Sequence, residues 1–168
     1  MTESGMTEET RVLEHFLDAQ RAAVLAIVEG LDDQRLRTPV LSSGWTPLGL
    51  VEHLGYAERH WFQRVAAGSA VALPWPAEDN DDDAPFASAH PAAQVFAFYR
   101  DQCQQSNAVL TSRPLGSPPA GKHGGETEDE VTDLRWIALH MIEETARHAG
   151  HLDAARELLD GQVGLGPR

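Results

Sequence analysis

The sequence has little of what marks several protein classes. Its 168 residues include a single cysteine, Cys103, so neither a disulfide framework nor a cysteine metal cluster is expected. No apolar run approaches the roughly 20 residues that span a membrane, and the polar N-terminus lacks the charged-then-apolar pattern of a signal peptide. We therefore expect a cytoplasmic protein in which Cys103 is a small buried apolar residue.

Positive charge is also scarce. The chain has 13 Lys and Arg residues against 26 Asp and Glu, which gives a formal net charge of -13. Such a charge repels phosphate backbones and anionic lipids, so we expect neither nucleic acid nor membrane as a partner. Hydrophobic residues make up 42% of the chain, enough for one core, and at this length we expect a single domain over residues 1–168.

Apolar residues recur at helical spacing in four segments, approximately 7–31, 47–68, 91–112 and 128–160. Thr46 and Pro47 supply a cap and a first-turn proline for the second segment, while Thr127 and Glu130 have capping-box spacing at the fourth. We find no convincing alternating strand. These features predict an all-α four-helix bundle. The connection lengths allow one long crossover from the second helix to the third, and a pure up-and-down topology is the alternative.

The two longest connections are rich in loop-forming residues. The first contains the acidic run of residues 78–83, and the second, 114–126, is rich in glycine and proline. The acidic run lacks the spaced ligands, central glycine and closing glutamate of an EF-hand. We therefore interpret it as a solvated loop and not as a calcium site.

The last helical segment carries a carboxylate and an imidazole at helical spacing. Glu144 and His148 are four residues apart, which places them about 40° apart and about 6 Å along the helix axis, so both can reach one ion. They lie at the edge of the apolar face, where a buried charge needs a partner, and a cation would supply it. The alternative is a solvated helix edge on which Glu144 pairs with His148 or Arg147 and nothing is bound.

A third ligand should come from another helix. The second helix has an inward stripe of apolar residues, namely Leu50, Leu54, Ala57, Trp61 and Val65. His53 flanks this stripe and is therefore the best candidate. Its neighbour Glu52 is expected to point toward solvent. His60 is two turns beyond His53, about 10 Å away, too far to share an ion easily. We expect His60, His140 and His151 to line the pocket, to orient a ligand or to act in catalysis.

Two stretches carry a resemblance to a known family. The sequences SGWTPLGLVEHLGYAERHWF and LRWIALHMIEETARHAGHLDAARELLDG, joined through a polar central region, resemble the DinB-like superfamily of metal-binding four-helix bundles. Within it, the chain is similar to an actinobacterial branch of unknown function and to the N-terminal domain of mycothiol-dependent maleylpyruvate isomerase. The zinc triad of that isomerase falls on His53, Glu144 and His148. Many other members have His-x-x-x-His on the last helix, where this chain has Glu144. We expect no counterpart of the isomerase's extra C-terminal domain, because the sequence ends soon after Gly161, and we therefore do not transfer its substrate.

Two imidazoles and one carboxylate leave a coordination position open, as in catalytic zinc sites, and the same donors can hold nickel or iron. With mycothiol implied by the resemblance, we expect a metal-dependent thiol S-transferase or isomerase that acts on small electrophiles. Two alternatives remain. One is a metal-dependent hydrolase in which His140 or His151 is the general base. The other is a non-catalytic metal or small-molecule binding protein of the stress response.

Other residues complete the expected pocket and surface. Trp45 and Arg64 are candidates for binding a cofactor, whereas Trp61 is expected to belong to the core. Ile142 and Phe62 lie off the inferred core faces. An apolar pair of this kind indicates a homodimer contact as one option.

Overall fold

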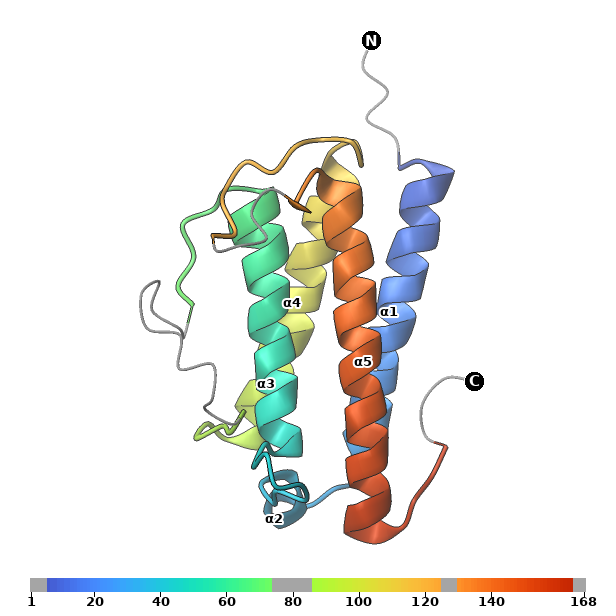
Figure 1. The fold of residues 1–168 in the computed structure, drawn as a ribbon, viewed down its shortest axis with the longest axis vertical. Helices are drawn as coiled ribbons and strands as arrows, with labels where there is room; N and C mark the ends of the chain where they lie inside the picture. Colours follow the sequence, from blue (N-terminus) through green and yellow to red (C-terminus); the bar gives the residue numbers. More distant parts are fainter. Residues whose placement is uncertain (1–5, 74–85, 125–129, 165–168) are drawn as a thin grey trace.

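The structure is a computed structural model that describes residues 6–73, 86–124 and 130–164. In these ranges the chain is helical and contains no strand, which confirms the all-α prediction (Figure 1). The elements are α1 (Glu8–Val28), α2 (Asp33–Leu36), α3 (Pro47–Glu58), the π-helix η1 (Arg59–Ala66), α4 (Ala92–Ser112) and α5 (Leu134–Asp160).

The bundle has four long helices: α1, the continuous α3–η1 helix, α4 and α5. Helix α1 packs mainly against α5, and α3 packs mainly against α4 (Figure 1). At the start of α3, the backbone N–H of Thr46 donates to the carbonyl of Phe86, 2.9 Å away, just before α4 begins. At the other end, the N–H of Gly121 donates to the carbonyl of Val65 at 2.9 Å, shortly before α5. Helices α3 and α4 therefore run in the same direction, as the predicted crossover requires.

The predicted start of the last helix is wrong. Helix α5 begins at Leu134 and not near residue 128, with the carboxylate of Asp133 accepting from the N–H of Trp136 at 2.9 Å. The N–H groups of Leu134 and Arg135 donate to carbonyls of residues 117 and 115, so this backbone is tied to the preceding loop. Glu130 precedes the helix, and the predicted capping residue Thr127 lies outside the described residues, as does the acidic run 78–83.

The remaining boundaries lie close to the predicted ones, with two additions. A short helix, α2, forms in a segment expected to be irregular, because the Asp32 carboxylate accepts from the N–H of Arg35 at 2.8 Å. The second predicted helix, 47–68, is continuous in direction but changes from α to π at Arg59. Such widened turns are frequent at functional sites.

The core confirms the expected inward face of α3 and η1, where all five members of the predicted stripe are buried: Leu50, Leu54, Ala57, Trp61 and Val65. Phe62 is also fully buried, since η1 turns two successive aromatic side chains, Trp61 and Phe62, into the core. Ile142 is half-buried and packs against the part of the core that contains Trp61 and Phe62. The prediction that Phe62 contributes to a homodimer surface is therefore wrong. Among the described residues, no helix is both long and apolar enough to cross a membrane.

A buried ion pair joins three helices beneath η1. The guanidinium of Arg21 on α1 donates to both carboxylate oxygens of Glu58 on α3 at 2.7 Å, and to Asn107 on α4 at 2.6 Å. Arg21 and Glu58 are 4% and 0% exposed. Cys103 lies nearby, half-buried; burial, followed by the charge of Glu58, raises its pKa to about 12. Cys103 is thus a protonated packing residue at neutral pH, although it is half-buried and not fully buried as expected.

Candidate metal centre

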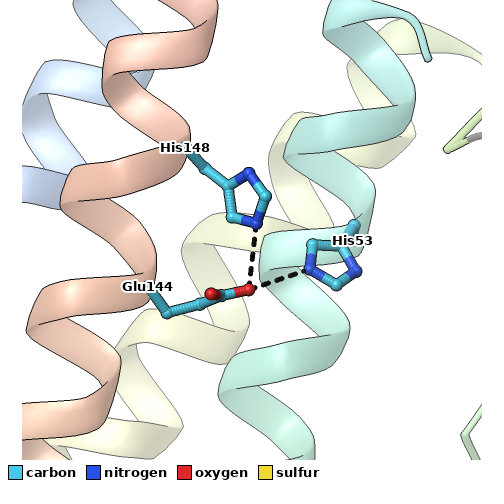
Figure 2. Close-up of side chains that lie close together, drawn as sticks. All are labelled: His53, Glu144 and His148. Atoms are coloured by element: carbon cyan, nitrogen blue, oxygen red, sulfur yellow. Dashed lines mark hydrogen bonds and ion pairs between the residues drawn. The ribbon is translucent and has the colours of Figure 1, made fainter. Parts of the chain in front are cut away.

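Helices α3 and α5 bring three predicted ligands together. The Thr46 hydroxyl accepts from the N–H of Gly49 and starts α3, which places His53 two turns into the helix. On α5, Glu144 and His148 occupy successive turns of the face toward α3. Figure 2 shows the two imidazoles pointing at the same oxygen of the carboxylate.

The donor atoms have the spacing of a coordination site. The Oε1 atom of Glu144 lies 3.2 Å from Nε2 of His53 and 2.9 Å from Nε2 of His148. All three donor atoms lie within 4.8 Å of one another, and among the described residues no other group of three meets this condition. Tetrahedral zinc with bonds of about 2.0–2.1 Å has its ligand atoms about 3.3 Å apart. The residues therefore fit a divalent cation with little movement.

The carboxylate of this trio is held in its charged form. Hydrogen bonds from His148 and then from His53 bring the pKa of Glu144 far below its usual range, although burial opposes this. An ionised carboxylate only accepts hydrogen bonds, so without a cation each Nε2 carries its proton toward Oε1. The side chains of His53, Glu144 and His148 are 20%, 23% and 12% exposed, so the site is shielded but open to a small molecule.

Phe86 is a part of the site that the sequence did not indicate. Its ring stacks on that of His53 at a centroid distance of 4.0 Å and meets His148 edge-on at 6.2 Å. The backbone of Phe86 passes so close to α3 that a Cβ at Gly49 would lie 2.1 Å from the Phe86 carbonyl oxygen. Gly49 therefore leaves the space that lets Phe86 pack on the His53 ring. The sequence did not indicate this contact, because a single phenylalanine in a predicted loop forms no pattern.

His151 lies behind His148, with the two Nδ1 atoms 3.3 Å apart. A group at the outer ring nitrogen of a metal-binding imidazole orients that ring and selects its tautomer. The indole of Trp45 lies beside His151 at 6.2 Å, at the edge of the candidate centre. Glu52 does not face solvent as predicted: its side chain is 15% exposed, and its carboxylate lies 2.6 Å from Nδ1 of His90.

His60 and His140 belong to a second group of rings nearer the α5 N-terminus. We call it the ring cluster; it comprises His60, Trp61, His123, Trp136 and His140. Nε2 of His60 lies 2.8 Å from Nδ1 of His123. His123 stacks on Trp61 at 4.4 Å, His140 meets Trp61 at 4.5 Å, and His140 stacks on Trp136 at 5.2 Å. His60 and His140 therefore do not join the three candidate ligands.

His123 was missed because it lies in a glycine- and proline-rich loop, where the only signal is an isolated histidine. The π-helix explains its position. The carbonyls of Val65 and Ala66 at the end of η1 accept backbone N–H groups of Gly121 and Ala120 at 2.9 and 3.2 Å. A Cβ at Gly121 would lie 2.1 Å from the carbonyl oxygen of Arg64, so only glycine permits this approach. The loop is thereby fixed so that His123 covers Trp61.

The buried imidazole of His60 predicts an acid-dependent loss of stability. Burial, then His123 and the charges of Arg64 and His140, lower the pKa of His60 from 6.5 to about 4. Arg64, a predicted cofactor-binding residue, thus lies near enough to act on His60. Below about pH 6.5, His60 binds a proton in the unfolded chain but not in the folded chain. The contribution of His60 to the free energy of unfolding is therefore complete above pH 6.5 and is lost as the pH falls toward 4.

We expect the free energy of unfolding to fall by about 2 kcal/mol more in the parent protein than in His60→Gln between pH 7 and pH 4.5. Urea denaturation with a chelator present measures this difference without a contribution from cation release. The exposed His15→Gln variant is the control and should behave as the parent. Equal pH dependence in all three proteins would refute the assignment.

A comparison with known proteins identifies the family of the chain. A family model described as mycothiol-S-transferase matches residues 12–161, a range that contains the three candidate ligands and the whole ring cluster. None of the curated proteins matches the sequence. The matching range covers most of the 168 residues. The resemblance to the DinB-like superfamily is confirmed, and the chain belongs to one of its metal-binding families, the mycothiol-S-transferase family.

Proposed function

We propose that this protein is a metal-dependent mycothiol S-transferase in which His53, Glu144 and His148 hold a zinc ion. The observation that carries the proposal is the convergence of two imidazole nitrogens on one carboxylate oxygen, with all donors within 4.8 Å. Three protein ligands leave a position open for a further molecule. Nickel and ferrous iron accept the same donors and remain the alternative cations.

A bound divalent cation lowers the pKa of a thiol that reaches it and so favours the nucleophilic thiolate. The protein's own contribution is positional. Glu144 supplies one negative charge that persists at any physiological pH, because its pKa is lowered by the two imidazoles. Phe86 fixes the His53 ring from one side, and His151 orients His148 from behind. The low exposure of the trio limits the access of water to the reacting thiol.

The test is an assay of zinc-loaded protein with mycothiol and a panel of small electrophiles, following thioether formation by mass spectrometry. We expect conjugation that requires both zinc and mycothiol. His53→Ala should abolish it, whereas His15→Ala, on the exposed face of α1, should not. Turnover without any thiol would instead support the hydrolase, and tight ligand binding without turnover would support the non-catalytic alternative.

A further inference from the structure

Residues 86–90 form a short segment that precedes α4 and passes α2 and the start of α3 (Figure 1). At its start, the ring of Phe86 stacks on that of His53 at a centroid distance of 4.0 Å and an interplanar angle of 18°. The N–H of Thr46 donates to the carbonyl of Phe86 at 2.9 Å. Four of the five residues are exposed, Phe86 itself at 39%, so burial contributes little to the position of the segment and polar contacts hold it.

Arg37 makes two of these polar contacts. Its Nη1 donates to the carbonyl of Ser88 and its Nη2 to the carbonyl of His90, both at 2.8 Å. The Nε of Arg37 donates to both carboxylate oxygens of Asp33 at 3.0 and 3.1 Å, which holds the guanidinium against α2. The planar guanidinium, with its donors in fixed directions, thus sets the position of two carbonyls at once. The carboxylate of Glu52, 2.6 Å from Nδ1 of His90, attaches the same end of the segment to α3.

Helix α2 gives this guanidinium a fixed base. Leu36, the residue before Arg37, is 4% exposed and packs in the core. With the segment held in this way, Phe86 covers one face of the His53 imidazole, and that ring cannot turn about its side-chain bonds without displacing Phe86. A ligand that is already oriented loses less side-chain entropy when a cation binds.

We propose that Arg37 is a positioning residue of the metal centre. It fixes the 86–90 segment so that Phe86 holds the His53 imidazole in the orientation that a cation requires. This inference rests on the proposed function, since the cation is the one that the three candidate ligands would hold. Arg37 acts only through the backbone carbonyls of the segment, so its contribution is the orientation of one ligand before the cation arrives.

NMR spectroscopy of the metal-free protein tests the positioning without any cation. An aromatic ring moves the resonances of protons over its face upfield, so the stacked ring of Phe86 shifts the ring protons of His53. Phe86→Leu removes this shift and defines its full size. We expect Arg37→Ala to lose at least half of it. Arg35→Ala is the matched control and should keep the whole shift, because Arg35 lies on the same short helix but its guanidinium donates to Asp32, the cap of α2, at 2.7 Å.

Metal affinity tests the consequence for the centre. Competition with a chromophoric chelator measures the dissociation constant for zinc, and the absorption spectrum of cobalt-loaded protein reports the ligand geometry. We expect Arg37→Ala and Phe86→Leu each to bind zinc about fivefold more weakly than the parent, as for an imidazole that must be ordered on binding. Arg37→Lys should recover only part of the affinity, because an ammonium cannot hold two carbonyls in a fixed geometry. A role of Arg37 in stability alone would lower the urea midpoint but leave the ring shift, the zinc affinity and the cobalt spectrum as in the parent.

The two proposals fail in different ways. If the parent binds no metal, the proposed function fails, while the ring shift still decides whether Arg37 positions His53. If the parent binds zinc but transfers no mycothiol, both readouts for Arg37 keep their meaning. An unchanged ring shift in Arg37→Ala, or a zinc affinity equal to that of the parent, would overturn the positioning role. If Arg37→Ala does not fold, Arg37→Lys decides in its place, because it keeps the charge beside Asp33 and should still lose part of the ring shift.

Discussion

Glu144→Gln is expected to lower kcat/KM for mycothiol transfer by about a thousandfold, equivalent to about 4 kcal/mol of transition-state stabilisation. The glutamine side chain has nearly the same shape but no charge, so the three-ligand set would lose its single anion. Both imidazoles now point at this oxygen, at 2.9 and 3.2 Å, and no other carboxylate among the described residues can replace it in such a group. Steady-state kinetics with one electrophile and saturating zinc measure the effect.

Glu143→Gln is the matched control for this variant. It removes the same charge one residue earlier on α5, at an exposed position that points away from α3. Its kcat/KM should stay within about twofold of the parent, since a surface charge at this distance is largely screened. If both variants retain the parent rate, the carboxylate of Glu144 has no part in the reaction.

Glu58→Leu is expected to lower the free energy of unfolding by about 3–5 kcal/mol. The carboxylate of Glu58 accepts two hydrogen bonds from Arg21 at 2.7 Å, and the pair is almost completely buried. Leucine would leave the guanidinium in the core with only the partly exposed Asp18 as a charged partner. Urea denaturation at pH 7 measures the loss.

The double variant Arg21→Met/Glu58→Leu separates the ion pair from simple packing. Removing both charges together avoids the unpaired cation, so most of the lost stability should return. Arg11→Ala is the exposed control: Arg11 pairs with Glu8 at 2.6 Å, but their side chains are 59% and 80% exposed, and no measurable change is expected. A double variant as unstable as Glu58→Leu would show that the charge of Arg21 is not the cause.

The parts of the structure that the sequence predicted are those set by regular periodicity. The stripe of α3 and η1 from Leu50 to Val65 is buried because residues three and four apart share one helix face. The same geometry placed Glu144 and His148 on adjacent turns, and it selected His53 from α3 as their partner. Once α3 and α5 pack side by side in the bundle, the Glu144 oxygen lies 2.9 Å from His148 and 3.2 Å from His53.

The parts that were missed depend on contacts between distant segments. The π-helix η1 leaves carbonyls that accept the N–H groups of residues 120 and 121, and only this contact brings His123 to Trp61. Phe86 reaches His53 because Gly49 leaves space for its backbone. The late start of α5 likewise follows from hydrogen bonds to residues 115 and 117. Helical periodicity carries no information about such loop positions.

Metal content tests the central claim most directly. Elemental analysis of protein purified without an affinity tag should find one divalent cation per chain, zinc in our proposal, and almost none in His53→Ala or His148→Ala. The His15→Ala protein, prepared in the same way, should keep the full amount. If no preparation contained metal, and the parent took up none on titration, Glu144 would be only the hydrogen-bond partner of two helix histidines and the proposed centre would not exist.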